Sequence, residues 1–235
     1  MDGETMNISI CNIRAVRRDW SLAAQGTFHE GVHLVTGDVG SGKSTLALIL
    51  AGLFSPAFGT VERHGIASQM VVFQSPEFHI TGSTLDGECR SWGADTAGVL
   101  ASAGLAGKND EDPLQLSRGE LKRLILACVL SRPYDLLILD EPFSSLDCRE
   151  KERLCRTLSS RSAGITILFT HEQAFFPKVD RIWEICSGTL WDRGRIPEAL
   201  AQWEHAPRTV KKLVEKGIIP ANISHANLRE AVCRM

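Results

Sequence analysis

Short apolar runs alternate with amphipathic stretches along most of this chain. Six runs rich in Val, Ile, Leu and Phe have the length and composition of β-strands. They cover residues 7–13, 32–36, 70–73, 136–140, 166–170 and 181–186. The run at 136–139 is apolar at every position, which is typical of a strand in a sheet that is covered on both faces.

Helical periodicity separates several of these runs. We predict helices at residues 43–53, 118–130 and 149–160. This alternation of strands and helices indicates an α/β fold with a largely parallel core sheet.

The pattern changes in two places. Between residues 78 and 116 small and polar residues dominate with weak helical periodicity, as at 96–105, which predicts a small helical insertion. From residue 196 the core pattern ends, and short helices are predicted at 209–216 and 225–233. We therefore divide the chain into a main domain (1–195), with the insertion at about 75–132, and a C-terminal helical extension (196–235).

Composition and charge fit this picture. The 235 residues are 43% apolar and 23% charged, as in a soluble globular protein that can bury a core. Lys and Arg number 26 against 28 Asp and Glu, which gives a formal net charge of −2. This balance provides no electrostatic reason to expect a nucleic-acid partner.

Cysteine usage and hydropathy bear on the compartment. The seven cysteines show no metal-ligand spacing, so we expect free thiols. We find no signal-peptide pattern at the N-terminus and no apolar run of the ~18 to 20 residues that span a bilayer. We therefore expect a cytosolic protein that can dock on a membrane protein.

The clearest chemical signal is a glycine-rich segment between the strand at 32–36 and the helix at 43–53. In such a loop, glycines let successive N–H groups curl around phosphate oxygens, and the next helix directs its positive dipole end at them. Lys43 is expected to reach the β- and γ-phosphates, and Ser44 to ligate magnesium. The segment predicts binding of a nucleoside triphosphate by Gly37, Asp38, Val39, Gly40, Ser41, Gly42, Lys43, Ser44 and Thr45.

Two carboxylates follow the apolar strand at 136–140. Asp140 is expected to hold magnesium, directly or through water, and Glu141 to polarise the water that attacks the γ-phosphate. An acidic pair at a strand end can also be a helix cap or a solvated turn. Its occurrence together with the phosphate loop favours the catalytic interpretation.

Further motifs occur in a characteristic order. Gln74 follows the strand at 70–73, and Leu-Ser-Arg-Gly-Glu (116–120) begins the predicted helix at 118–130. Ser-Ser-Leu-Asp (144–147) comes shortly after Glu141, and Thr-His-Glu (170–172) lies at the end of the next strand. In this order they resemble the motifs of the ATP-binding-cassette (ABC) ATPases, over roughly residues 7–195. The resemblance implies a P-loop NTPase of the ABC type, with a mostly parallel core sheet, an antiparallel N-terminal β part and a helical insertion.

The resemblance also implies a mechanism in which two subunits sandwich two ATP molecules head to tail. Ser117 and Gly119 of one subunit would face the γ-phosphate on the other subunit's phosphate loop, and Asp147 would help to join the two sites. Gln74 would sense nucleotide and magnesium and move the helical insertion. The implied cofactors are ATP and Mg²⁺, with Lys43, Glu141 and His171 as catalytic residues and Ser44, Gln74 and Asp140 at the metal.

Structural roles compete with these assignments. Ser117 is expected to be a helix N-cap as well, with Glu120 completing a capping box. Asp147 is a candidate cap of the helix at 149–160, and a single histidine such as His171 is more often a packed or solvated side chain. The joint order of the motifs favours the functional assignments.

The chain departs from the family pattern in the signature motif and near the adenine. Arg118 stands where glycine is commonest, and Glu120 where glutamine is commonest. Residues 11–18 contain no aromatic side chain to stack on adenine. Trp20 is a candidate replacement, although a core or surface position is the favoured interpretation, and Tyr134 is expected to be a packing residue.

Two segments suggest a branch of the family. Residues 73–79 resemble the corresponding loop of energy-coupling-factor ATPases, with His79 in place of the last glutamine, and residues 217–220 resemble the dimerising tail of that group. This resemblance implies import of a vitamin or transition-metal ion by a complex at the cytoplasmic face of the membrane. The implied partners are a second ABC ATPase, a transmembrane coupling subunit and a substrate-binding membrane subunit.

Two other classes stay open. A non-transport ABC ATPase acting on DNA or ribosomes would need a coiled-coil insertion or a second cassette, and we find neither in the sequence. A catalytically weak partner in a heterodimer is kept open by the altered signature, although Glu141 and His171 are both present.

Overall fold

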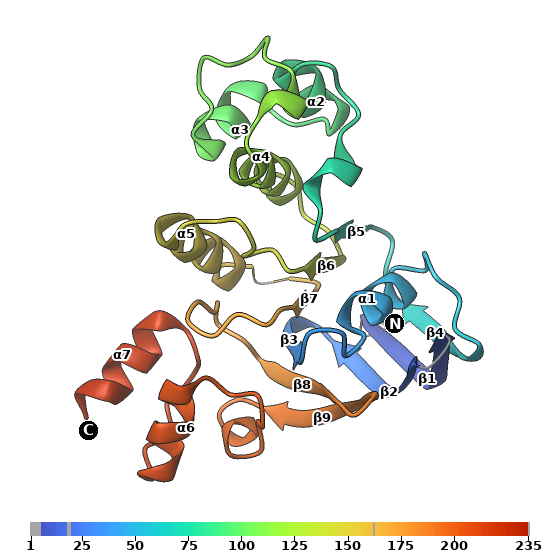
Figure 1. Cartoon of the computed structure of the whole chain (residues 1–235), viewed down its shortest axis with the longest axis vertical. Helices are drawn as coiled ribbons and strands as arrows, with labels where there is room; N and C mark the ends of the chain where they lie inside the picture. The colour runs from blue at the N-terminus through green and yellow to red at the C-terminus, as the bar shows by residue number, and fades with distance from the viewer. Residues whose placement is uncertain (1–5, 18–19, 162, 235) are drawn as a thin grey trace, which may run out of the picture.

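The computed structural model describes residues 6–17, 20–161 and 163–234 (Figure 1). In this part of the chain one nine-stranded sheet has the order β4-β1-β2-β9-β8-β3-β7-β6-β5. The strands are β1 (Asn7–Arg17), β2 (Trp20–His29), β3 (Gly31–Gly37), β4 (Phe58–His64), β5 (Gln69–Val72), β6 (Leu136–Asp140), β7 (Ile165–Phe169), β8 (Arg181–Cys186) and β9 (Thr189–Arg195).

The strands from β8 to β5 pair in parallel, and the antiparallel pairs lie toward the β4 end of the sheet, where β2 and β9 also pair in parallel. β3 pairs in parallel with β7 and β8, and β6 with β5 and β7. β1 pairs antiparallel with β2 and β4, and β8 with β9. The predicted α/β fold with a mostly parallel core and an antiparallel N-terminal part is confirmed.

Three strands of the structure were absent from the sequence-based prediction. β4 is exposed along almost its whole length, so its sequence has no apolar run. β2 contains small and polar residues, and β9 follows β8 after a tight turn. All three are stabilised by pairing with neighbouring strands, which a search for apolar runs does not detect.

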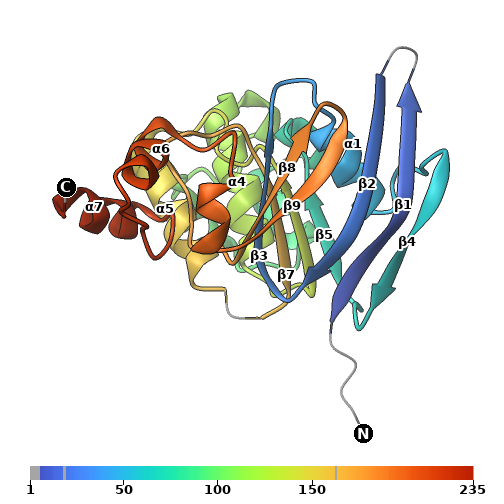
Figure 2. The same ribbon diagram turned by 90° about the horizontal axis from the view of Figure 1, so that it is seen from below.

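The fully apolar sequence of β6 follows from helices on both faces of the sheet. Leu137 and Leu139 belong to one buried cluster together with residues of α4 (Arg118–Leu130) and α5 (Cys148–Ser159). Leu136 and Ile138 belong to a second cluster, with residues of α1 (Lys43–Leu50). Figure 2 shows α4 and α5 on one side of β3, β7 and β5, and α1 on the other.

The segment after β5 forms a helical layer at the top of Figure 1. It begins with η1 (Pro76–His79) and contains α2 (Leu85–Ser91), α3 (Thr96–Ala103), η2 (Pro113–Gln115) and α4. The three α-helices share a small buried cluster of their own, with Leu85, Leu100 and Leu124 among its members. Because α2 is short and carries Gly and charged residues, its periodicity is too weak to be recognised in the sequence.

The C-terminal segment packs onto the main core. It contains η3 (Glu198–Ala201), α6 (Arg208–Glu215) and α7 (His225–Cys233), close to the helices expected at 209–216 and 225–233. Trp203, Val210 and Ile223 are buried in the same cluster as Leu34 and Leu168 of the central strands. A boundary at residue 195 stays a prediction, since residues on both sides of it share one core.

Two observations concern thiols and membranes. The seven cysteines are all free thiols. Across residues 6–17, 20–161 and 163–234, we find no helix with both the length and the apolar content required to cross a bilayer.

A buried histidine in β3 leads to a prediction about acid stability. The His33 Nδ1 accepts a hydrogen bond from Trp183 Nε1–H at 3.1 Å, and Nε2 lies 2.7 Å from the carbonyl oxygen of His29. This pairing requires the neutral ring with its proton on Nε2. Burial accordingly lowers the pKa of His33 to about 4.

We expect the free energy of unfolding to fall by about 2 kcal/mol through His33 between pH 7 and pH 4.5. Below pH 6.5 the His33 imidazole binds a proton in the unfolded chain, whereas in the folded chain it stays neutral until about pH 4. Acid therefore favours the unfolded state. Urea unfolding of the wild type and of His33→Gln at both pH values measures the difference. An equal pH effect in the two proteins would contradict the role of His33, and the exposed His64→Gln serves as control.

Candidate functional site

The glycine-rich loop lies between β3 and α1, as predicted. Gly42 is the N-cap of α1 and has a φ of 107°, in the left-handed region that favours glycine. A Cβ atom at Gly42 would lie 2.2 Å from the indole ring of Trp20. Glycine is therefore required here both by the backbone conformation and by the neighbouring ring.

Lys43 is held against the loop that precedes it. Its Nζ donates hydrogen bonds to the carbonyl oxygens of Gly37 (2.8 Å) and Asp38 (2.9 Å), and the side chain is 7% exposed. Burial lowers the pKa of Lys43, while the nearby Glu141 and Asp140 carboxylates oppose this shift. A largely desolvated cation beside the loop attracts an anion more strongly than a fully solvated one would.

Glu141 is fixed by the end of β7. Its carboxylate accepts hydrogen bonds from Thr170 Oγ1 (3.1 Å) and from the backbone N–H of His171 (3.1 Å), and Oε1 lies 2.7 Å from His171 Nδ1. The backbone of Glu141 has a φ of 47°, which is uncommon for a residue other than glycine. Such strained residues cluster at functional sites, where the surrounding structure holds them in place.

Asp140 is buried with an unsatisfied oxygen. Its Oδ1 has no hydrogen-bond partner among the described residues. Burial raises the pKa of Asp140, and a hydrogen bond with Ser44 opposes the rise. A buried carboxylate oxygen next to a serine hydroxyl is a donor set that suits a hard divalent cation such as Mg²⁺.

Gly42, Lys43, Ser44 and Glu141 line one cavity of about 380 Å³, and Asp140 directly precedes Glu141 at its edge. This volume is in the range of small-molecule sites in proteins. The cavity thus gathers side chains from the loop before α1, the end of β5 and the ends of β6 and β7. It is lined by Trp20, Val39, Gly40, Gly42, Lys43, Ser44, Thr45, Gln74, Glu141 and His171.

Seven predicted residues lie outside this lining. Gly37, Asp38, Ser41 and Asp140 belong to segments that border the cavity, whereas Ser117, Gly119 and Asp147 belong to other elements. Ser117 caps α4. Its hydroxyl accepts a hydrogen bond from the Glu120 N–H, and the Glu120 carboxylate accepts one from the Ser117 N–H. The predicted capping box is therefore confirmed. Asp147 caps α5 by accepting from the Glu150 N–H at 2.9 Å. A Cβ atom at Gly119 would lie 2.8 Å from the Ser145 carbonyl oxygen, so glycine is required for this close approach.

Trp20 packs partly on the core, in agreement with the favoured interpretation of the sequence. The same side chain also lines the cavity beside Gly42, so its alternative role near the adenine stays a prediction. Residues 11–18 contain no aromatic side chain for the adenine, and the last of them, Arg18, lies outside the described residues. Tyr134 is buried in the core, as expected.

Lys122 is a residue that sequence reasoning missed. It lies in α4 with 1% of its surface exposed, and its Nζ donates to the carbonyl oxygens of Phe73 and Gln74, each at 3.2 Å. Burial lowers the pKa of Lys122 to about 8. On the other side of this loop, His79 Nε2 accepts a hydrogen bond from the Phe73 N–H at 3.0 Å. Lys122 lies one helical turn before the buried Ile125, so it occupies a core-facing position of α4. A charged residue at such a position was the feature by which the sequence could have indicated it.

Comparisons with known proteins agree with this arrangement. The protein-family model described as ABC transporter matches residues 25–144, about half of the chain. The chain is 36% identical over 183 residues to an energy-coupling factor transporter ATP-binding protein, EcfA1, of Thermotoga maritima, covering 68% of this chain and 69% of that protein. It is 37% identical over 175 residues to an aliphatic sulfonates import ATP-binding protein, SsuB 2, of Frankia alni, covering 71% and 68%.

Solved structures show the same fold. A bacterial Atm1-family ABC exporter with ATP bound matches with a TM-score of 0.69 and 23% identity, over 80% of this chain and 38% of that one. The dimeric post-hydrolysis state of the ATP-binding cassette MJ0796, bound to ADP and Pi, matches with a TM-score of 0.64 and 19% identity, over 78% and 96%. The chain therefore spans little more than a third of the exporter and most of the isolated cassette.

Proposed function

The chain belongs to the ABC transporter ATP-binding family, and we propose that it is the ATPase subunit of an energy-coupling-factor importer. The single observation that carries the catalytic part of this proposal is the convergence of Lys43, Ser44, Gln74, Glu141 and His171 on one cavity. These side chains come from four separate segments, and each suits one part of ATP hydrolysis.

The phosphate loop and Lys43 bind the triphosphate. The N–H groups at the start of α1 and the buried Lys43 ammonium face the same cavity, so both direct positive charge at phosphate oxygens. Lys43 is already aligned by the carbonyl oxygens of Gly37 and Asp38. This alignment reduces the reorganisation needed when ATP enters.

Glu141 acts as the base that polarises the attacking water. Its two oxygens are oriented by Thr170 and His171, so the carboxylate is held in one position at the cavity wall. His171 is more than half exposed on its side chain, which leaves its ring accessible to the γ-phosphate. Proton transfer depends on such fixed geometry between the base and the water.

Magnesium fits the oxygen donors of this site. Ser44, Asp140 and Gln74 would hold the ion, and the unsatisfied Asp140 Oδ1 is the observation that favours it. Bound there, the ion would neutralise charge on the phosphates of ATP.

The functional unit is a dimer that closes around ATP. Ser117 and Gly119 lie outside the cavity of their own chain, and they would meet the phosphates bound by a second ABC ATPase subunit. The start of α4 at Ser117 offers helix N–H groups to that phosphate. Closure places them there, and hydrolysis releases them.

The loop after β5 is the part that would contact the membrane subunits. Phe78 in this loop is 78% exposed, and its ring packs edge-on against Phe73, with centroids 6.3 Å apart. It offers an apolar side chain to a partner. Together with the similarity to EcfA1, this supports a transmembrane coupling subunit and a substrate-binding membrane subunit as partners. The substrate would be a vitamin or a transition-metal ion, and the complex would lie at the cytoplasmic face of the membrane.

Affinity purification from membranes in mild detergent tests the transporter assignment. We expect a small multi-helix membrane protein and a second ATPase subunit to co-purify with the chain. Recovery of ribosomal or DNA-repair proteins in their place would contradict it. Recovery of a membrane partner with a periplasmic or extracellular sulfonate-binding protein would indicate another class of importer.

A second candidate function is a catalytically weak subunit of a heterodimeric ABC ATPase. The observation that favours it is the hydrogen bond that the Ser117 hydroxyl donates to the Glu120 carboxylate at 2.7 Å. This bond engages the hydroxyl and places a negative charge beside the position expected for the partner subunit's phosphate. The Ser117 interactions lower the pKa of Glu120, which keeps this carboxylate ionised. Co-purification of a different ATPase chain, with hydrolysis only in the mixed dimer, would support this candidate.

Trp20 is proposed to stack on the adenine ring. We expect Trp20→Ala to weaken ATP binding about tenfold, since stacking of a base on an aromatic side chain contributes about 1 to 3 kcal/mol. Inorganic triphosphate has no base, so its binding should change little. Competition between each ligand and a fluorescent ATP analogue measures both affinities. An equal loss for ATP and triphosphate would assign Trp20 to support of the phosphate loop and contradict stacking.

A further inference from the structure

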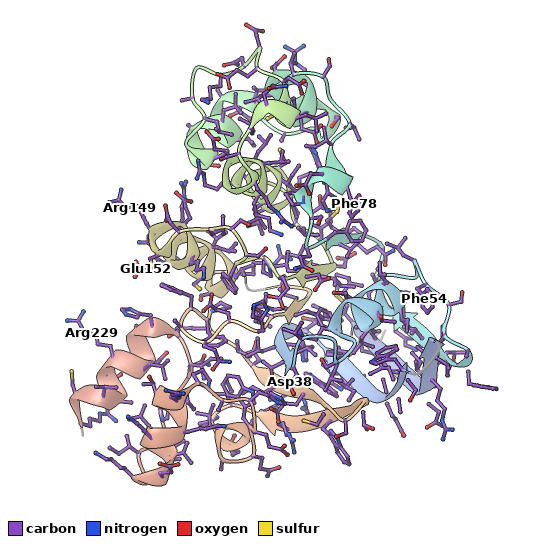
Figure 3. All side chains as sticks on the ribbon, in the orientation of Figure 1. Asp38, Phe54, Phe78, Arg149, Glu152 and Arg229 are labelled. Carbon is purple, nitrogen blue, oxygen red and sulfur yellow. The ribbon has the colours of Figure 1, made fainter. Side chains whose placement is uncertain are left out.

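The C-terminal segment contacts the base of the phosphate loop at two points. Trp203 donates its Nε1–H to Thr36 Oγ1 at 2.9 Å, and His205 Nε2 lies 3.4 Å from Asp38 Oδ1. Thr36 and Asp38 flank Gly37 at the end of β3. Figure 3 labels Asp38 next to the ribbon of the C-terminal segment.

Trp203 is the stronger of the two contacts. Its side chain is 3% exposed and packs edge-on against Phe176, with ring centroids 5.9 Å apart. Thr36 is buried as well, so the bond between them is shielded from water. A buried indole N–H needs a partner, and here that partner belongs to the strand that leads into the phosphate loop.

Glu184 anchors the second contact. This carboxylate is fully buried in β8, where it pairs in register with Thr36. It accepts hydrogen bonds from the N–H groups of Glu204 (3.1 Å) and His205 (2.7 Å) and from Arg193 Nε (2.5 Å), and it lies 2.8 Å from His205 Nδ1. The imidazole is thereby held with its other nitrogen directed at Asp38.

Cys186 lies in the same cluster as Glu184 and His205. The carboxylate, thiol and imidazole of these three residues would also suit a metal ion. Glu184, Cys186 and His205 offer donor atoms within 4.8 Å of one another. The Arg193 guanidinium, however, donates to both Glu184 and Cys186 Sγ, so a positive charge already occupies the position of a cation. The cluster is therefore an ion-pair anchor for the C-terminal segment.

The two contacted residues adjoin the carbonyl groups that orient Lys43. Lys43 Nζ donates to the carbonyl oxygens of Gly37 and Asp38. A rotation of either peptide group would move the acceptor on which the ammonium depends. The hydrogen bond to Thr36 restrains the chain before Gly37. The contact of His205 with Asp38, which is an ion pair when the imidazole is protonated, restrains it after Gly37.

We propose that Trp203 and His205 are positioning residues for the phosphate loop, which hold residues 36–38 so that Lys43 is aligned for the phosphates of ATP. This inference rests on the proposed phosphate contact of Lys43. It assigns the C-terminal segment a part in nucleotide binding, in addition to the dimerising role expected from its sequence.

Trp203→Phe and His205→Gln in the full chain test the proposal. We expect Trp203→Phe to weaken ATP and ADP binding about fivefold, which corresponds to the loss of one buried hydrogen bond. His205→Gln should weaken it less, about threefold, because the Asp38 carboxylate is exposed and water screens its contact with His205. Calorimetric titration measures the dissociation constants. Trp191→Phe and His225→Gln, on exposed side chains of the same region, should bind as the wild type.

A double-mutant cycle separates positioning from general support of the fold. If Trp203 acts through Thr36, Trp203→Phe should cause no further loss of ATP affinity in a Thr36→Val background. Thermal unfolding without nucleotide is measured in parallel. Lower melting temperatures with unchanged dissociation constants would mean that Trp203 and His205 only stabilise the fold, and this result would overturn the proposal.

The Lys43→Ala variant distinguishes failure of this inference from failure of the proposed function. Full ATP affinity in Lys43→Ala would overturn the phosphate contact on which both depend. Loss of affinity in Lys43→Ala, with wild-type affinity in Trp203→Phe and His205→Gln, would overturn only the role of the C-terminal segment.

Discussion

Glu141→Gln is expected to reduce ATP turnover by at least about 100-fold while ATP binding is kept. The amide has nearly the shape of the carboxylate, but it cannot take up a proton from the attacking water. Because hydrolysis reopens the dimer in the proposed cycle, the variant should also accumulate as a closed dimer when ATP is present. Phosphate release measures turnover, and size-exclusion chromatography with and without ATP measures dimerisation.

The matched control is Glu152→Gln, the same substitution on an exposed position of α5 (Figure 3). It should hydrolyse ATP at the wild-type rate. An unchanged turnover rate in Glu141→Gln would remove Glu141 from the proposed mechanism. Reduced turnover combined with lost ATP binding would instead assign Glu141 to the integrity of the cavity, since its bonds to Thr170 and His171 join the ends of β6 and β7.

Lys43→Ala is expected to weaken ATP binding by about 100-fold, a free-energy loss of about 3 kcal/mol. Hydrogen bonds between an ammonium and phosphate are charge-assisted, and burial strengthens them further. The loss should fall on ATP and ADP, whose phosphates Lys43 is proposed to reach. Binding of a fluorescent ATP analogue, with ATP and ADP as competitors, measures it.

Two measurements make the result for Lys43 interpretable. Thermal unfolding without nucleotide checks the fold, because the substitution leaves the Gly37 and Asp38 carbonyl oxygens without their ammonium partner. Lys211→Ala, on the exposed side of α6, is the control for loss of one positive charge. Full ATP affinity in a folded Lys43→Ala protein would contradict the phosphate-loop assignment.

The resemblance to ABC ATPases, drawn from motif order, is confirmed by the family match and by the similarity to EcfA1. Motif order is informative because the phosphate loop, Gln74, Glu141 and His171 each follow a strand of the core, and parallel strands bring their C-terminal ends to one edge. Gln74, Glu141 and His171 are distant in sequence, yet they line one cavity with Lys43 for this reason. Their individual roles stay predictions.

Elements without an apolar run were beyond the reach of the sequence. The exposed edge strand β4 and the short helix α2 depend on pairing and packing with distant segments. The C-terminal segment also depends on packing with distant segments. Its apolar residues predicted two helices, but they did not indicate that Trp203 is buried in the main core. Tertiary context decides such elements more than local propensity does.

By itself, the sequence determined the phosphate loop, the carboxylates after β6 and the largely parallel sheet, because glycine conformations and continuous apolar strands are local requirements. The tertiary structure alone decided that Trp20 lies against Gly42 and that Trp203 bonds to Thr36. Each of these pairs joins residues far apart in the chain. Their contact depends on strand register and on the packing of side chains across the sheet, which no short sequence pattern records.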